Sequence, residues 1–299
     1  MKIHLLDAHF LGHNDVIAAF LVEHDGALAL VETGPHATFK TLCKAIKMAG
    51  FDWRDIKHVL LTHIHFDHAG AAWAMAETGA TIYVHPVGVR HLHDPTKLYN
   101  SAKMIYGDRM EELWGDMKGI PLEKIHPTAD NEVLTFGGLQ FRAIHTPGHA
   151  VHHIAWQCGD AIFAGDAAGV KIGGGPVMPP CPPPDINIED WKTSLDKIQA
   201  AKPAALWLTH FGEIRHIEEH LAELRKRLDA WATWMYPYYL SGEAAASITP
   251  KFMAFVAADL LANGVPQTDI ARYEGANPSW MSVAGLLRYW NKKEGTKVG

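Results

Sequence analysis

Four side chains that can bind a metal ion fall within six consecutive positions of this sequence, namely His63, His65, Asp67 and His68. Residues two positions apart in an extended segment point to the same side, so His63 and His65 can hold one ion between them. Asp67 and His68 lie past an expected bend, where they offer a carboxylate oxygen and an imidazole nitrogen to a second ion. A single histidine would be interpreted as a surface turn residue. Four ligands at this spacing predict a metal centre instead.

Regular elements on either side of this cluster would hold it in place. Residues 59–62 read as a buried strand that leads into it, and residues 69–77 read as a helix that ends at Gly79. The other predicted strands cover residues 14–22 and 27–31 around the turn pair Asp25-Gly26, then 81–84, 132–136, 139–144, 153–157, 161–164 and 204–208. The other predicted helices cover residues 38–49, 188–201 and 215–234, with one beginning at Pro250 and a last one over 279–292.

Three further potential ligands, His149, Asp166 and His210, come soon after predicted strands. Taken singly, each could be a turn residue or a buried structural histidine. Loops at strand ends often carry catalytic groups while the sheet fixes their positions, so together these residues become site candidates. Residues 169–184 are rich in Gly and Pro, which predicts an irregular segment at the mouth of the site.

The cluster resembles the His-X-His-X-Asp-His signature of the metallo-β-lactamase superfamily. Four more segments appear in the order that this superfamily uses: Val31-Glu32-Thr33-Gly34, Thr146-Pro147-Gly148-His149, Phe163-Ala164-Gly165-Asp166 and Leu208-Thr209-His210-Phe211-Gly212. Five ordered motifs carry far more weight than any single one. The resemblance implies an α/β (α+β) fold, a four-layered αββα sandwich. The expected catalytic domain covers residues 1–236, and residues 237–299 are expected to form a C-terminal helical subdomain.

The same resemblance implies which side chain binds which ion. The first metal would be bound by His63, His65 and His149, the second by Asp67, His68 and His210, and Asp166 would bridge the two. Imidazole and carboxylate ligands without thiolates suit two divalent ions, with zinc expected first and iron or manganese also suitable. Asp67 is expected to be catalytic as well, because it could accept a proton from the attacking water.

Some residues near these motifs are expected to support the ligands. Glu32 stands where the superfamily more usually has aspartate, and it is expected to orient a ligand imidazole, although its extra methylene leaves that contact open. His145, His152 and His153 surround His149 in the sequence, and none of them is expected to be a ligand.

Residues 94–119 form an insertion with six large apolar side chains, Tyr99, Met104, Tyr106, Met110, Trp114 and Met117. One interpretation is that they form the packed core of a local helix. The alternative is that they form part of a wall over the metal site, where aromatic and Met side chains suit an adaptable pocket.

The composition narrows the class of protein. A net charge of -6 among 299 residues gives no general attraction for polyanions, so no nucleic-acid partner is expected. Cys43, Cys158 and Cys181 are too scattered for a disulfide framework and are expected to be small buried apolar residues. The N-terminal residues meet a charge too early for a signal peptide, and no segment is expected to be long enough to span a bilayer. No membrane partner is therefore expected, which predicts a cytoplasmic protein. Homodimerisation is a further hypothesis.

The leading functional prediction is a binuclear metallo-hydrolase that uses a metal-bridging hydroxide to cleave a small-molecule ester, thioester or lactone. A thioester of glutathione or coenzyme A is the first choice and a lactone the second. The C-terminal segments 277–280 and 285–289 do not match the basic glutathione-binding tail of glyoxalase II, so the substrate stays open. Two alternatives remain, an iron-dependent persulfide dioxygenase with one iron on the same scaffold and a non-catalytic, metal-bound regulatory protein.

Overall fold

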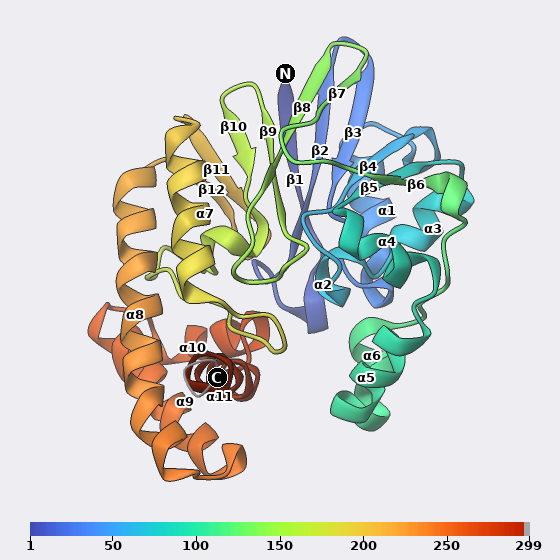
Figure 1. The fold of residues 1–299 in the computed structure, drawn as a ribbon. Coiled ribbons are helices and arrows are strands. Elements are labelled where there is room, and N and C mark those ends of the chain that lie inside the picture. Colours follow the sequence, from blue (N-terminus) through green and yellow to red (C-terminus); the bar gives the residue numbers. More distant parts are fainter. Residues whose placement is uncertain (296–299) are drawn as a thin grey trace.

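Two six-stranded β-sheets form the centre of the computed structural model, which describes residues 1–295 (Figure 1). The first sheet has the strand order β1-β2-β3-β4-β5-β6. Its strands are β1 (Lys2–Asp7), β2 (Ala18–His24), β3 (Ala27–Val31), β4 (His58–Leu60), β5 (Thr81–Val84) and β6 (Ile125–Pro127). The pairs β1·β2 and β2·β3 are antiparallel, and the pairs from β3 to β6 are parallel.

The second sheet has the order β12-β11-β10-β9-β8-β7. Its strands are β7 (Val133–Phe136), β8 (Leu139–His145), β9 (Ile154–Cys158), β10 (Ala161–Phe163), β11 (Ala205–Leu208) and β12 (Gly212–Ile214). Only β10 and β11 pair in parallel. The crossover between these two strands contains a helix, as a parallel connection requires.

The facing sides of the two sheets bury an aromatic core. Phe20 of the first sheet packs against Phe163 of the second with ring centroids 5.4 Å apart, and Trp156 is fully buried in the same cluster. On the outer side of the first sheet lie α1 (Phe39–Met48), α3 (Ala72–Glu77) and α4 (Pro86–His93). On the outer side of the second lie α7 (Ile188–Ala200) and α8 (Ile217–Ser241). The predicted αββα sandwich is therefore confirmed.

The insertion at residues 94–119 forms two helices, α5 (Thr96–Tyr106) and α6 (Met110–Trp114). Both interpretations of its apolar residues hold in part. Met110 is buried in a local cluster with Phe66, whereas Tyr106 and Trp114 line a cavity. Met104 belongs to neither group, because 83% of its surface is exposed.

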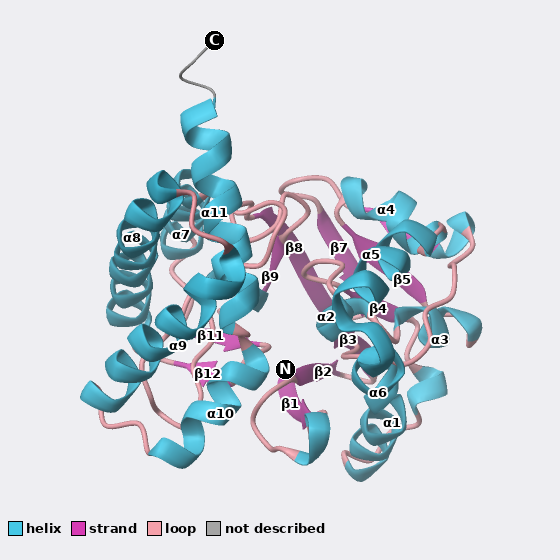
Figure 2. Ribbon diagram, turned by 90° about the horizontal axis from the view of Figure 1, so that it is seen from below, coloured by secondary structure: helices cyan, strands magenta, loops and turns pink. Residues whose placement is uncertain are grey.

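The C-terminal region is helical, but it does not begin at residue 237. Helix α8 runs through Pro237 to Ser241, so the expected boundary lies inside a helix. The remaining helices are α9 (Ala245–Ala262), α10 (Gln267–Ala276) and α11 (Ser279–Gly295). They lie at the same end of the sandwich as α5 and α6, below the sheets in Figure 1, and Figure 2 shows that end from below.

Helix α9 differs from the expectation that no segment could span a bilayer. Its 18 residues have a mean hydropathy of 1.3, which meets the length and composition of a membrane-crossing helix, and 22% of them are buried. The buried residues recur at every fourth position, from Ile248 through Phe252 and Val256 to Leu260. That stripe packs against α8 and α11, as in a surface helix on a protein core. The absence of a membrane partner stays a prediction.

Several local elements were not predicted from the sequence. Strands β1, β6 and β12 and helices α4 and α10 were missed, and the predicted helix at 69–77 is divided into α2 (Phe66–Ala69) and α3. Pro250 lies in the second turn of α9 rather than at its start. Short 3₁₀ turns cover Phe10–Gly12, His36–Thr38, Trp53–Asp55, Gly107–Arg109, Leu122–Lys124 and Gly165–Ala168.

Candidate metal centre

The seven predicted ligands meet at one end of the sandwich, in loops that follow strands of both sheets. Four of them come from the segment between β4 and α2 and from α2 itself, and the others follow β8, β10 and β11. His65 is the N-cap residue of α2, so the chain bends there and sends Asp67 and His68 to a different side from His63. This is the bend that the sequence predicts.

The first group of ligand atoms comes from His63, His65 and His149. The Nε2 atom of His63 lies 2.9 Å from Nδ1 of His65, and that Nδ1 lies 3.1 Å from Nε2 of His149. Three imidazole nitrogens from two distant segments thus converge on one point. These three residues therefore form one group that could hold a metal ion.

The second group comes from Asp67, His68 and His210. An oxygen of Asp67 lies 3.7 Å from Nε2 of His68 and 3.4 Å from Nε2 of His210. These three residues form another group that could hold an ion. A third group, His63, His68 and Asp166, takes one histidine from each set, so the two sets adjoin and the assignment of ligands to separate ions stays a prediction.

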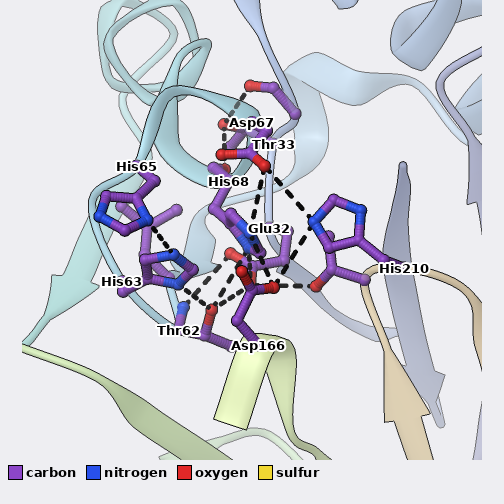
Figure 3. A network of polar contacts seen from close by, with 12 residues as sticks. Glu32, Thr33, Thr62, His63, His65, Asp67, His68, Asp166 and His210 are labelled. Carbon is purple, nitrogen blue, oxygen red and sulfur yellow. Dashed lines mark hydrogen bonds and ion pairs between the residues drawn. The ribbon is translucent and has the colours of Figure 1, made fainter. Parts of the chain in front are cut away.

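Asp166 lies between the two groups (Figure 3). Its Oδ1 atom is 3.2 Å from Nε2 of His68 and 3.5 Å from Nε2 of His210, while Oδ2 is 3.3 Å from Nε2 of His149. Within residues 1–295, Oδ1 of Asp166 and the Nε2 atoms of His68 and His210 are buried without a hydrogen-bond partner. Buried polar atoms that face one another unpaired are costly, so this donor set fits bound cations.

Burial and the neighbouring charges shift the pKa values of these groups. Burial alone would raise the pKa of Asp166, but His68, His149 and His210 hold it well below its ordinary value. The pKa of Asp67 is lowered to about 2, because His68 and His210 outweigh its burial. Burial lowers the pKa of His65 to about 3. At neutral pH the carboxylates are thus ionised and the imidazole of His65 is neutral, as ligands must be.

Glu32 makes the contact that the sequence left open. Its Oε1 atom lies 3.0 Å from Nδ1 of His68, and both side chains are fully buried. The same carboxylate accepts hydrogen bonds from the hydroxyl of Thr62 and from the backbone N–H of Thr62 at 3.2 Å (Figure 3). Glu32 also has a left-handed φ of 65°, which turns it away from β3. It orients His68 so that Nε2 faces Asp166.

Backbone carbonyls orient two other ligand imidazoles. Nδ1 of His149 lies 2.9 Å from the carbonyl oxygen of Pro180, and Nδ1 of His210 lies 2.6 Å from that of Val16. A hydrogen bond at Nδ1 fixes the tautomer that leaves Nε2 free as a ligand. Both carbonyls belong to irregular segments with no recognisable motif, so sequence reasoning missed them.

The C-terminal helices hold the loop that carries Pro180. The side-chain amide of Asn277 donates to the carbonyl oxygen of Pro179 at 3.1 Å and accepts from the hydroxyl of Ser282 at 3.1 Å. The hydroxyl of Ser282 also accepts from the backbone N–H of Cys181 at 3.4 Å. Residues more than 90 positions away therefore fix the carbonyl that orients His149.

The neighbouring histidines are not in either ligand group. Nδ1 of His153 bonds to the hydroxyl of Thr146 at 2.8 Å, and its ring lies 5.1 Å from that of His63. His145 bonds to the carbonyl oxygen of Thr128 at 3.0 Å. His152 faces the cavity, and burial lowers its pKa to about 2.

A cavity of about 920 Å³ opens beside the two ligand groups. Five of the seven ligand residues line it: His65, Asp67, His149, Asp166 and His210. Asp67 keeps 21% of its side chain exposed, whereas Asp166 keeps only 5%. Asp67 is therefore the carboxylate that a water molecule in the cavity reaches more easily.

Comparison with known proteins gives the family. The model of the metallo-beta-lactamase superfamily matches residues 14–210. A metallo-beta-lactamase fold-containing protein of Sulfurisphaera tokodaii is 31% identical over 184 residues, which are 59% of this chain and 70% of that protein. A hydroxyacylglutathione hydrolase of Acidiphilium cryptum is 28% identical over 245 residues, or 77% and 83% of the two chains.

Solved structures of metallo-beta-lactamase superfamily proteins have the same fold as this chain. An archaeal metallo-beta-lactamase superfamily protein from Sulfolobus tokodaii superposes with a TM-score of 0.63 at 25% identity, over 74% of this chain and 85% of that one. A metallo-beta-lactamase family protein from Thermus thermophilus superposes with a TM-score of 0.67 at 21% identity, over 98% and 94% of the two chains. The second likeness concerns the fold alone and extends into the C-terminal helices. This chain belongs to the metallo-beta-lactamase superfamily, whose members are in general metal-dependent hydrolases.

Proposed function

We propose that this protein is a binuclear metal-dependent hydrolase that cleaves thioesters, with lactones as the second substrate class. One observation supports this most directly: Asp166 lies between two complete groups of ligand atoms, with Oδ1 3.2 Å from His68 and Oδ2 3.3 Å from His149. The site would hold two divalent ions, with zinc expected first. Such a pair would supply Lewis acidity and lower the pKa of a bound water to about 7.

The protein groups have separate tasks in this proposal. Asp67 is ionised and partly exposed to the cavity, so its carboxylate can accept the proton of the attacking water. Glu32, Pro180 and Val16 hold the ligand imidazoles in place. In the overall reaction water adds to the carbonyl carbon and the carbon–sulfur bond breaks. The products are a carboxylate, a thiol and one released proton.

The comparisons support a thioester as the first choice. The relative from Acidiphilium cryptum is named a hydroxyacylglutathione hydrolase, and a hydroxyacylglutathione is a thioester. The alignment with that relative covers most of both chains. Its identity of 28% leaves room for a different acyl group and a different thiol, so the exact substrate is a separate proposal.

The second ligand group favours hydrolysis over a persulfide dioxygenase with one iron. In the mononuclear alternative, the inward-facing atoms of Asp67, His68 and His210 would have no ion to share. Nε2 of His68 and Nε2 of His210 would then stay buried without a partner among the described residues. A purely regulatory protein would likewise not need a large cavity beside the ligands.

Two measurements on one preparation test the proposal. Protein purified without added metal is analysed for metal content and then assayed on a panel of thioesters, lactones and phosphoesters. We expect two equivalents of divalent metal and turnover of at least one thioester. Asp67→Asn should lower turnover by more than about 100-fold, whereas the exposed control Asp55→Asn should keep the wild-type rate. Iron at one equivalent, with oxygen uptake on a glutathione persulfide, would refute the proposal.

A further inference from the structure

The cavity beside the metal centre has two chemically different ends, and helix α5 runs between them. Lys97 near the start of α5 and Ile105 near its end both line the cavity. They are eight residues apart, which is about 12 Å along an α-helix. The lining at the start of α5 is cationic, whereas the lining near its end is mostly apolar, because Arg109, which also lines the cavity there, is paired with Glu112 at 3.0 Å. Glu274 of α10 adds one carboxylate to the lining. The inference drawn from this polarity rests on the proposed function.

The apolar end is built from aromatic side chains that pack on one another. Trp114 stacks on Phe10 with centroids 5.7 Å apart and contacts Tyr106 at 5.3 Å. Tyr106 in turn meets Trp280 of α11 at 5.9 Å. All four line the cavity, so the insertion and the C-terminal helices form opposite parts of one apolar wall.

This apolar end lies beside the second ligand group. Ile17 lines the cavity there, and the carbonyl of its neighbour Val16 holds the imidazole of His210. Phe66, which directly precedes the ligand Asp67, lies with its ring centroid 5.9 Å from that of Trp114.

The opposite end carries two cations from neighbouring helices, Arg90 of α4 and Lys97 of α5. Across the described residues 1–295, no carboxylate lies within 4.0 Å of either cation. Both act on His91, whose pKa is lowered first by burial and then by these two charges. Asp94 interacts with Lys97 from outside the cavity, and Asp185 is the acidic residue that lines the cavity at this end. The lining there carries two cations and one carboxylate, which leaves a net positive charge.

The cationic end lies beside the first ligand group. His152 follows the ligand His149 by three positions and lines the same cavity. Gly88 of α4 packs directly on Ile64, which precedes a ligand of this group, and this contact places Arg90 of the same helix on that side of the site. The cationic end of the cavity therefore lies beside the first ligand group, and the apolar end lies beside the second.

We propose that the substrate is a thioester that joins an apolar acyl group of medium length to an anionic thiol. The acyl group lies against the aromatic wall of Phe10, Tyr106 and Trp114. Phosphate or carboxylate groups of the thiol face Arg90 and Lys97, which attract them at the mouth of the cavity. The reacting carbonyl then lies between the two ends, beside Asp67.

A matched set of thioesters tests the preference for the acyl group separately from the preference for the anionic thiol. Acetyl and octanoyl groups are each joined to coenzyme A, to glutathione and to neutral N-acetylcysteamine, and kcat/KM is measured on the metal-loaded protein for all six thioesters. On the neutral thiol, octanoyl should exceed acetyl by at least about 100-fold, since each buried methylene adds to binding. Coenzyme A and glutathione thioesters should both exceed the neutral one. The larger advantage identifies phosphate or carboxylate as the preferred anion.

Charge variants test the cationic end. Arg90→Gln and Lys97→Gln should each lower kcat/KM for the preferred anionic thioester by about threefold, and the double variant by about tenfold. The same variants should leave the N-acetylcysteamine thioesters unchanged. Lys103→Gln removes an exposed charge from the same helix outside the cavity and is the matched control. Equal losses for Lys97→Gln and Lys103→Gln would overturn the assignment.

A pair of neighbouring variants tests the apolar end. Ile105 lines the cavity and is 50% exposed, whereas Met104 is 83% exposed and lies outside it, so neither substitution disturbs a core. Ile105→Glu should reduce the octanoyl-over-acetyl ratio on the neutral thiol by about tenfold, and Met104→Glu should leave that ratio unchanged. An unchanged ratio in both variants would place the acyl group elsewhere.

The outcomes of this inference and of the proposed function are distinguishable. If no thioester is hydrolysed by metal-loaded protein, the proposed function fails and takes the inference with it. If thioesters are hydrolysed without preference for octanoyl over acetyl or for anionic over neutral thiols, the function stands and this inference is wrong.

Discussion

Oε1 of Glu32 lies 3.0 Å from Nδ1 of His68, and neither side chain has any exposed surface. Glu32 is too deep to bind an ion together with His68, because Nε2, the other nitrogen of that ring, is the atom that faces Asp166. The contact therefore sets the orientation and the tautomer of a ligand. The contact forms despite the longer glutamate side chain, whose backbone has a φ of 65° at the end of β3.

Replacing Glu32 should weaken the second ligand group selectively. Glu32→Gln keeps the shape but removes the charge, and we expect the affinity for the second zinc ion to fall by about 10-fold to 100-fold. Glu32→Asp shortens the side chain by one methylene and should give a smaller loss. Zinc titration in a chelator buffer measures both. Identical affinities in wild type and Glu32→Gln would refute the orienting role.

Gly148 directly precedes the ligand His149, and it should be essential for packing this loop against α7. A Cβ atom at Gly148 would lie 2.3 Å from Cα of Trp191, and φ at this glycine is +136°. Gly148→Ala should therefore destabilise the fold by about 3 kcal/mol or more, from backbone strain and overpacking together. Gly159→Ala is the control, because φ is also positive there but the nearest atom is the end of the Met1 side chain at 3.9 Å. Urea unfolding measures both, and equal losses would contradict the packing argument.

Asn277 should affect the metal centre from a distance. Asn277→Ala removes the donor to Pro179 and the acceptor for Ser282, so the loop should release the carbonyl of Pro180 that orients His149. We expect several-fold weaker binding of the first ion and a loss of about 1–3 kcal/mol in unfolding free energy. Asn263→Ala removes two hydrogen bonds to Asp259 at the end of α9, one to its backbone carbonyl and one to its carboxylate, and serves as the control. Zinc binding that changes equally in both variants would show a merely general effect on stability.

The cysteines should react slowly with thiol reagents. Burial raises the pKa of both Cys43 and Cys158 to about 11, and it raises that of Cys181 further. At pH 8 a thiol with that pKa is about one-thousandth thiolate, which is the reactive form. Reaction with a chromogenic disulfide should thus be slow in native protein, begin at the half-buried Cys43 and accelerate as pH rises towards 11. Fast reaction of a full equivalent at pH 8 would contradict the interpretation of these residues as structural.

The sequence predicts much of the fold because its turns and strands are marked locally. Asp25-Gly26 forms the predicted hairpin, with φ of 47° and 83°. Strands such as β5 and β8 lie within a residue of their expected ends. Helix α10 and the three-residue strands β6 and β12 were missed because they are short and are stabilised by packing rather than by a local pattern. The end of α8 was misplaced because Pro237 ends a helix by local rules yet lies inside one here.

In the candidate site, too, some residues could be predicted from the sequence and others could not. The seven side chains of the motifs were named from the sequence, since their types and order are visible along the chain. The carbonyls of Pro180 and Val16 were not, because any residue type can supply a carbonyl and only the folded backbone decides which one is near. The aromatic wall joins Trp114 to Phe10 and Tyr106 to Trp280, and such long-range pairings leave no periodic signal.

The number of metal ions bound per chain tests the central claim most directly. We expect two equivalents of zinc in wild type, about one in His210→Ala, and a lowered metal content with no measurable turnover in Asp166→Asn, because that carboxylate lies between both groups. A single equivalent in wild type that His210→Ala does not change would contradict the two-ion account. So would two retained equivalents with normal turnover in Asp166→Asn.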